Sequence, residues 1–250
     1  MQANPIYVYR WARWSQVTAC AMVLALTTGC VSTQTSQQVE NLESIAENPR
    51  IIMMPPDIRY YLLTAGGISE PHAEWTLAAQ TNFSNAAREF STTIGTDMRI
   101  LDPDDTSDLE VEYEQLHSAV GLTILDHHFG ATKLPGKGSG QVFDWSLGPG
   151  VKELGDKHDA DYALFVYYRD YQASGGRVAF AILAAAAGSY VPAGSEHGFA
   201  SLVDLRTGNV VWFNRVADGS GEMRQEDGAI AAMKTLFSDI PTAQDNGTAE

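Results

Sequence analysis

The chain has 250 residues, of which 44% are hydrophobic, and its formal net charge is −15 at pH 7. This length and apolar content predict one domain of generous size. The acidic balance argues against a nucleic-acid-binding protein, which needs a basic surface, and against broad electrostatic adhesion to anionic lipid.

The first stretch to interpret is a short apolar run at residues 17–30, V-T-A-C-A-M-V-L-A-L-T-T-G-C. Arg10 and Arg13 precede it, and no acidic residue occurs before Glu40. A basic segment, an apolar segment and small residues before a cleavage point form a secretory signal. Because the run ends in Cys30, it is similar to a bacterial lipoprotein signal, in which the thiol takes a diacylglyceryl group.

We therefore predict that residues 1–29 are removed and that Cys30 is lipidated, with palmitate among its acyl chains. Several acyl chains make a lasting membrane anchor, whereas one does not. Thr27 departs from the Leu that such signals prefer, and Cys20 lacks an apolar run before it. Three alternatives stay open: a secretory signal without lipid, an uncleaved anchor, and a buried helix of a cytosolic protein. In the lipoproteins that this signal resembles, an Asp directly after the cysteine retains the protein in the inner membrane. The residue here is Val31, which favours the outer membrane.

Removal of the signal fixes the composition of the mature chain. It has 14 basic and 31 acidic residues, a formal charge of −17, and no free thiol for a disulfide or a thiolate metal site. Residues 30–48 are predicted to be the lipidated N-terminus and a polar tether, with a short helix near 39–46. As a flexible coil, this tether spans roughly 20–25 Å. A periplasmic domain at 49–238 and a disordered tail at 239–250 complete the prediction.

Strands and helices alternate in the first half of the domain. The apolar run 50–54 predicts a strand that Pro55 and Pro56 end. Helical spacing of apolar residues, capping residues and short apolar runs predict the following elements: a helix at 72–91, a strand at 97–101, a helix at 109–129, and a shorter helix from Asp144 or Ser146 to 154. Residues 161–168, D-Y-A-L-F-V-Y-Y, predict the central strand of a sheet.

The second half contains the most unusual run, V-A-F-A-I-L-A-A-A-A, which begins at Val178 and ends at Ala187. As a helix it has no polar face, so it must be buried in the domain, packed against a second subunit in a homo-oligomer, or laid on a membrane. Residues 199–205 and 210–213 predict a hairpin whose turn needs a positive φ at Gly208 or Asn209. A last helix is predicted at 222–237.

The expected order is β-α-β-α-α-β-α-β-β-α. Such an order predicts an α/β fold in one domain, a mixed sheet covered by helices in two or three layers.

Seven segments then resemble an uncharacterised family of proteobacterial lipoproteins. They are M-P-P-D-I (54–58), L-T-A-G-G (63–67), E-P-H-A-E-W-T (70–76), D-W-S-L-G (144–148), D-A-D-Y-A-L-F-V (159–166), A-S-G-G-R (173–177) and L-V-D-L-R-T-G-N-V-V-W-F (202–213). More distantly, the element order is similar to periplasmic domains of the curli-secretion lipoprotein and TolB N-terminal kind. The resemblance implies a role in envelope assembly, secretion or protein–protein contact, often as an oligomer.

No catalytic residue, metal site or cofactor is predicted. In Asp126-His127-His128, side chains of adjacent helical residues point about 100° apart, so they do not converge on zinc. Gly136-Lys137-Gly138 lacks the spacing of a phosphate loop.

Four charged residues, Asp57, Arg169, Asp170 and Arg177, are predicted to form a partner or pocket surface. The alternative is that Arg169, Asp170 and Arg177 form an ion pair that fixes a turn. The sequence predicts a non-enzymatic protein-interaction or envelope-assembly module, tethered to the outer membrane and facing the periplasm. The alternative is a periplasmic hydrolase or small-ligand-binding protein, with a pocket between the segment from Pro55 to Gly67 and residues 169–177.

Overall fold

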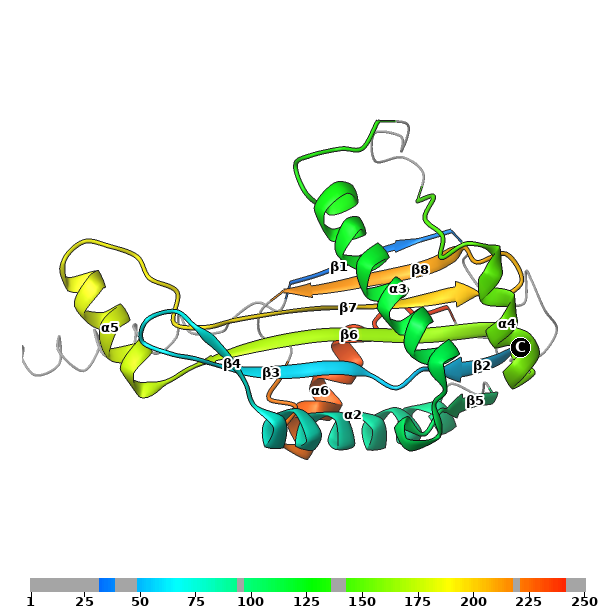
Figure 1. The fold of residues 1–250 in the computed structure, drawn as a ribbon, viewed down its shortest axis with the longest axis horizontal. Helices are drawn as coiled ribbons and strands as arrows, with labels where there is room; N and C mark the ends of the chain where they lie inside the picture. The colour runs from blue at the N-terminus through cyan, green and yellow to red at the C-terminus, as the bar shows by residue number, and fades with distance from the viewer. Residues whose placement is uncertain (1–31, 39–48, 94–96, 136–142, 218–220, 242–250) are drawn as a thin grey trace, which may run out of the picture. The chain divides into compact units, whose positions relative to one another are not determined.

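The computed structural model describes residues 32–38, 49–93, 97–135, 143–217 and 221–241 (Figure 1). The chain divides into two units, Met1–Val31 and Ser32–Glu250, and all the described residues belong to the second unit. This unit is a single mixed-sheet α/β domain, as predicted. The predicted signal, most of the tail and the candidate phosphate loop lie outside the described residues.

The described strands are β1 (Ser32–Gln37), β2 (Arg50–Met53), β3 (Asp57–Leu63), β4 (Ser69–Pro71), β5 (Asp97–Ile100), β6 (Tyr162–Ala173), β7 (Ser195–Asp204) and β8 (Val210–Ala217). The α-helices are α2 (Ala73–Thr93), α3 (Asp108–Ile124), α4 (Lys152–His158), α5 (Gly175–Ala186) and α6 (Glu226–Leu236). A π-helix at Leu125–Phe129 continues α3.

The sheet is organised around β6, in the order β1-β8-β7-β6-β2-β5. Two successive strands, β2 and β3, lie parallel to the same edge of β6, and β4 pairs with β3. Pro55 and Pro56 interrupt this edge because proline has no backbone N–H to donate. The prediction that they end a strand is confirmed, but the chain resumes beside β6 at Asp57, and β3 was not predicted.

The central position of β6 is confirmed, and both of its faces are covered. Tyr162, Leu164 and Tyr168 belong to a hydrophobic core with α2 and α6. Ala163 and Phe165 belong to a second core with α3 and α4. Successive strand residues point to opposite faces, so a strand between two helical layers is apolar throughout. The fold is therefore a three-layer α/β/α sandwich (Figure 1).

Strand β1 corrects the predicted tether. Residues 32–37 form an edge strand antiparallel to β8, with Ser32 opposite Ala217 and Gln37 opposite Trp212. The sequence of β1, S-T-Q-T-S-Q, is polar and resembles a linker, and only its pairing with β8 identifies it as a strand. The helix predicted near 39–46 lies outside the described residues.

One turn and the start of one helix were only partly predicted. Gly208 has φ +81°, so it is the residue that takes the positive φ in the β7–β8 hairpin, and Asn209 is not. A Cβ at Gly208 would lie 2.1 Å from the carbonyl oxygen of Gly148. The helix predicted from Asp144 or Ser146 begins later: Ser146 bridges to Asn209, and α4 starts at Lys152.

Candidate functional site

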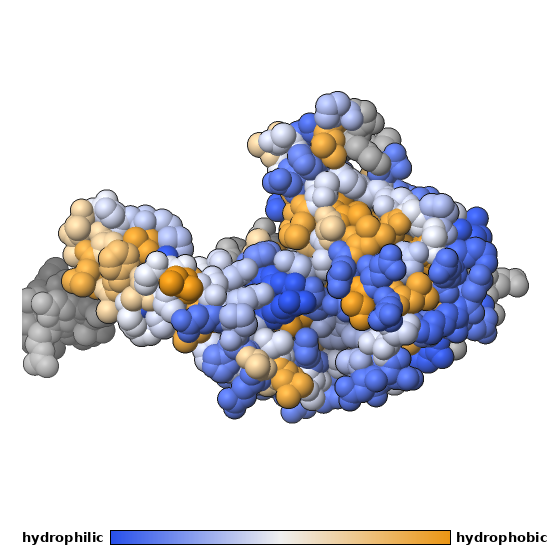
Figure 2. All heavy atoms as spheres, in the orientation of Figure 1, coloured by the Kyte–Doolittle hydropathy of each residue, from blue (hydrophilic) through white to orange (hydrophobic). Residues whose placement is uncertain are grey.

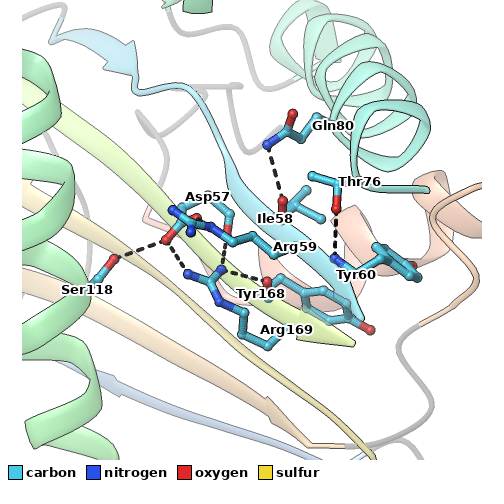
Figure 3. A network of polar contacts seen from close by, with 9 residues as sticks. All are labelled: Asp57, Ile58, Arg59, Tyr60, Thr76, Gln80, Ser118, Tyr168 and Arg169. Carbon is cyan, nitrogen blue, oxygen red and sulfur yellow. Dashed lines mark hydrogen bonds and ion pairs between the residues drawn. The ribbon is translucent and has the colours of Figure 1, made fainter. Parts of the chain in front are cut away.

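A buried ion pair links β3 to β6 (Figure 3). Asp57 is 6% exposed and Arg169 is 7% exposed. Arg169 donates from Nη2 to Asp57 Oδ2 at 2.7 Å and from Nη1 to the Asp57 carbonyl oxygen at 2.7 Å. Its guanidinium also lies 3.9 Å from the ring centroid of Tyr167. The strand register explains why Asp57 and Arg169 are in contact. Asp57 is opposite Tyr167, and Arg169 is two residues after Tyr167, so its side chain is on the same face of β6.

A second arginine shares the same carboxylate. Arg59 donates from Nε to Asp57 Oδ1 at 2.9 Å, because residues two apart on a strand share a face. Burial by itself raises the pKa of Asp57, but Arg169 and Arg59 outweigh burial and hold that pKa below its ordinary value. Asp57 is therefore a fixed anion between two cations.

Helix α3 adds a carboxyl group of a different kind. Ser118 donates from Oγ to Asp57 Oδ2 at 3.4 Å, and Glu114 lies one helical turn earlier on the same face. Burial, followed by the negative charge of Asp57, raises the pKa of Glu114 to about 7. This side chain therefore changes charge near neutral pH.

Beside this network lies an open groove of about 800 Å³. One wall is the outer edge of β3, where Tyr60 donates its N–H to Thr76 Oγ1 at 3.0 Å and Gln80 donates from Nε2 to the Ile58 carbonyl at 3.2 Å (Figure 3). The lining mixes charged, polar and apolar side chains. It includes Arg59, His72, Leu77, Arg88, Asp104 and Glu114.

The structure does not bring the four predicted surface residues together. Asp57 and Arg169 meet, but both are buried, and only Asp57 borders the groove. Asp170 is also buried, at 3% exposure, and accepts from Gln172 Nε2 at 2.9 Å. The four residues therefore do not share one surface: Asp57 borders the groove, whereas Asp170 borders a separate hollow with Ala193 and Glu196. Strand alternation is the reason: Asp170 points to the face opposite that of Arg169.

The environment of Asp170 contrasts with that of Asp57. Burial, together with the negative charges of Glu196 and Glu222, raises the pKa of Asp170 to about 6, although the hydrogen bond from Gln172 opposes this rise. Among the described residues, no arginine forms an ion pair with this carboxyl: Arg169 pairs with Asp57, and Arg224 pairs with Glu222. The buried carboxyl groups on the two faces of β6 thus have opposite pKa shifts.

Arg177 lies apart on α5, where it donates from Nε to the Pro192 carbonyl at 2.9 Å. The alternative prediction, an ion pair among Arg169, Asp170 and Arg177, is wrong because Arg169 pairs with Asp57.

Sequence reasoning missed Arg59 and Glu114. A strand at 57–63 would have placed Arg59 beside Asp57, but the double proline before it hid that strand. Glu114 had no local signal, because only the packing of α3 against β6 brings it close to Asp57.

Helix α5 contains most of the apolar run 178–187, for which three environments were predicted: the domain core, a second subunit, or a membrane. Burial in the domain is wrong, because α5 has no buried residue. Phe180, Ile182 and Leu183 are 48%, 64% and 69% exposed. Figure 2 shows apolar spheres where Figure 1 labels α5, beyond the end of the sheet.

The histidines have separate roles. His117 is fully inside the core, stacked on Phe165 and 2.6 Å from Ser201 Oγ, and burial lowers its pKa to about 3. His127 contacts the Thr132 carbonyl, whereas His128 contacts Ser36. Among the described residues, no group of three His, Cys, Asp or Glu side chains is arranged to hold a metal ion.

The described helices include none with the length and hydropathy needed to cross a bilayer. The fold and the network define the class of this protein as a single-domain, mixed-sheet α/β protein. No family model and no curated protein match the chain.

The chain is similar to solved structures at a low level. The PelC dodecamer from Paraburkholderia phytofirmans has 11% identity and a TM-score of 0.39, and the match covers 86% of this chain and 100% of that chain. A single-substitution variant of that dodecamer gives 11% identity, a TM-score of 0.39, and coverages of 85% and 99%. Likeness at this level carries no argument about function or assembly.

Proposed function

We propose that the protein is a lipoprotein, anchored through Cys30 to the periplasmic face of the outer membrane, that acts as a non-enzymatic interaction or envelope-assembly module. The observation that carries the proposal is the position of the domain boundary. The compact unit begins at Ser32, two residues after Cys30. Removal of residues 1–29 therefore leaves β1, the edge strand of the sheet, intact.

The early start of the domain also changes the expected distance from the membrane. With residues 32–37 in β1, only Val31 separates the lipidated residue from the folded sheet. The domain is then held close to the lipid surface instead of hanging from a long coil.

Mass spectrometry of protein purified from membranes tests the anchor. We expect an N-terminal peptide that begins at Cys30 and carries acyl chains, and we expect Cys30→Ser to abolish both processing and acylation. Separation of the two membranes by density is expected to place the parent protein in the outer membrane. An unmodified N-terminus, or unchanged processing of Cys30→Ser, contradicts the proposal.

The groove is the surface that we assign to a protein partner. Its lining combines exposed Leu77, 66% accessible, with the charged Arg59 and Glu114, and interfaces combine an apolar centre with polar groups. A photo-cross-linking amino acid at Leu77 is expected to capture a specific protein in cells. The same amino acid at Leu122, an exposed leucine outside the groove, is the control.

A small-ligand-binding protein is the second candidate, and the groove favours it too. A volume of about 800 Å³ with several polar side chains falls within the range of ligand pockets. Thermal shift against a metabolite library separates the candidates. Stabilisation that Arg59→Ala removes supports a ligand, whereas cross-linking at Leu77 without any such stabilisation supports a protein partner.

A further inference from the structure

The first observation is that α5 and the start of β1 lie at the same end of the sheet. In the strand register, Arg169 of β6 is opposite His197 of β7, which is opposite Ala217 of β8. Ala217 is in turn opposite Ser32, the first residue of β1. Among the described strands, β3, β4, β6 and β7 extend beyond this level, and β6 leads into α5 (Figure 1).

Ser32, the first described residue, begins β1 at this end. Cys30 is two residues before Ser32, so their Cα atoms are at most about 7 Å apart. β6 continues for four residues from Arg169 to Ala173, which is about 13 Å of strand.

The second observation is the charge of the arm, which we define as residues 173–195. Arg177 is its only charged residue, although the mature chain has 31 acidic residues. An acidic surface is repelled by anionic lipid, and the arm, which has one arginine and no acidic residue except Glu196 just beyond its end, lacks that repulsion.

The third observation is where exposed apolar side chains gather. Ten large apolar side chains are exposed among the described residues, and six of them are at this end. The six are Ile68, Val178, Phe180, Ile182, Leu183 and Tyr190. Ile68 belongs to the turn after β3, and this turn touches the arm where Ser174 donates its N–H to the Leu63 carbonyl at 3.0 Å.

We propose that the arm is a second membrane contact, in which α5, Tyr190 and Ile68 insert into the boundary between headgroups and acyl chains of the bilayer that holds Cys30. This inference rests on the proposed lipid anchor. The helix has 12 residues, about 18 Å, and is too short to span a bilayer, so it enters one leaflet only. A single lipid-bearing residue leaves the domain free to tilt, whereas two contacts fix its orientation.

A fluorescent probe at matched positions tests the proposal. Val178 in the arm and Val111 on α3 are both valines at 42% exposure. Val111 lies toward the opposite end of β6. It follows Glu110, whose Oε1 is 2.6 Å from Nε2 of His158, and His158 comes four residues before β6 begins at Tyr162. Val178→Cys and Val111→Cys are each made in the full chain, purified from membranes, and labelled with an environment-sensitive fluorophore. Acylated Cys30 offers no competing thiol.

The labelled proteins are reconstituted into vesicles of phosphatidylethanolamine and phosphatidylglycerol that contain brominated lipid. We expect the probe at residue 178 to be quenched several-fold more than the probe at residue 111. Equal quenching overturns the proposal. A blue-shifted but unquenched probe at residue 178, in a protein that sediments as an oligomer, also overturns it and assigns the arm to a second copy.

Mass spectrometry of the same samples separates this test from the test of the anchor. If Cys30 carries no acyl group, the lipoprotein proposal fails. The two cysteine variants are then remade with Cys20→Ser and Cys30→Ser, so that the fluorophore labels residue 178 or residue 111 alone, and this unacylated protein is added to the same vesicles. Quenching at residue 178 above that at residue 111 then still supports the arm as a membrane contact, whereas equal quenching overturns it.

Discussion

Strand β6 and helix α5 are consecutive, and both are apolar, yet they have opposite surroundings. β6 has a strand along each edge and a helical layer on each face, so nine of its twelve residues are buried. α5 begins where the sheet ends, and none of its residues is buried. The comparison teaches that an apolar run predicts a surface that needs covering, but the neighbouring elements decide whether the chain itself covers it.

The largest expected effect comes from matched phenylalanines in the two elements. Phe165 in β6 is 1% exposed, and Phe180 in α5 is 48% exposed. We expect Phe165→Ala to lower the free energy of unfolding by about 3–5 kcal/mol, because it leaves a cavity. Phe180→Ala is expected to change it by less than about 0.5 kcal/mol. Urea unfolding measures both values, and equal losses would contradict the exposure of α5.

Removing the cation of the buried pair is expected to have a somewhat smaller effect. Arg169→Leu leaves the Asp57 carboxylate buried with only Arg59, and we expect a loss of about 3 kcal/mol. Arg59→Leu is the control, because the Arg59 side chain is 56% exposed, and its loss is expected to be below about 1 kcal/mol. A loss for Arg169→Leu as small as that of the control would argue that the pair does not hold β3 to β6.

Asp170 predicts a pH dependence of stability. Its pKa is raised from 3.8 to about 6 in the folded state, so the folded chain binds this proton more tightly than the unfolded chain. Stability from this group is present below about pH 4 and is lost as pH rises to about 6, by roughly 2–3 kcal/mol. We expect Asp170→Asn to be more stable than the parent above pH 6 and similar at pH 4.

Thermal unfolding between pH 4 and 8 measures this effect. Asp57→Asn is the contrasting variant: the Asp57 carboxyl has a pKa below 3.8, so its stabilising effect is fully present above about pH 4 and is lost only at lower pH. We therefore expect the stability difference between Asp57→Asn and the parent to stay constant from pH 4 to 8, whereas that of Asp170→Asn changes. If Asp170→Asn and the parent have parallel pH profiles, the raised pKa of Asp170 is contradicted.

The smallest expected effect is local to the arm. Ser174 Oγ accepts the N–H of Arg177 at 3.2 Å and caps the start of α5. Ser174→Ala is expected to lower the free energy of opening of α5 by about 1 kcal/mol, measured by hydrogen exchange of its amides, without a change in global stability. Ser189→Ala, an exposed serine just after the helix, should have no effect. A global loss instead would contradict the independence of the arm from the core.

The sequence by itself determined the fold class, the central strand, the double proline as an interruption, and the hairpin turn. These features follow from local rules: side-chain alternation, the missing N–H of proline, and the φ that glycine tolerates. The sequence also predicted a lipid-bearing Cys30, which stays a prediction.

Only the tertiary structure decided that residues 32–37 are a strand, that Asp57 pairs with Arg169, and that the run in α5 is exposed. An edge strand is defined by its partner, and an ion pair by two residues that lie 112 positions apart in the chain. Exposure depends on where the rest of the sheet ends. Each of these is a relation between distant segments, and no local pattern of residues encodes it.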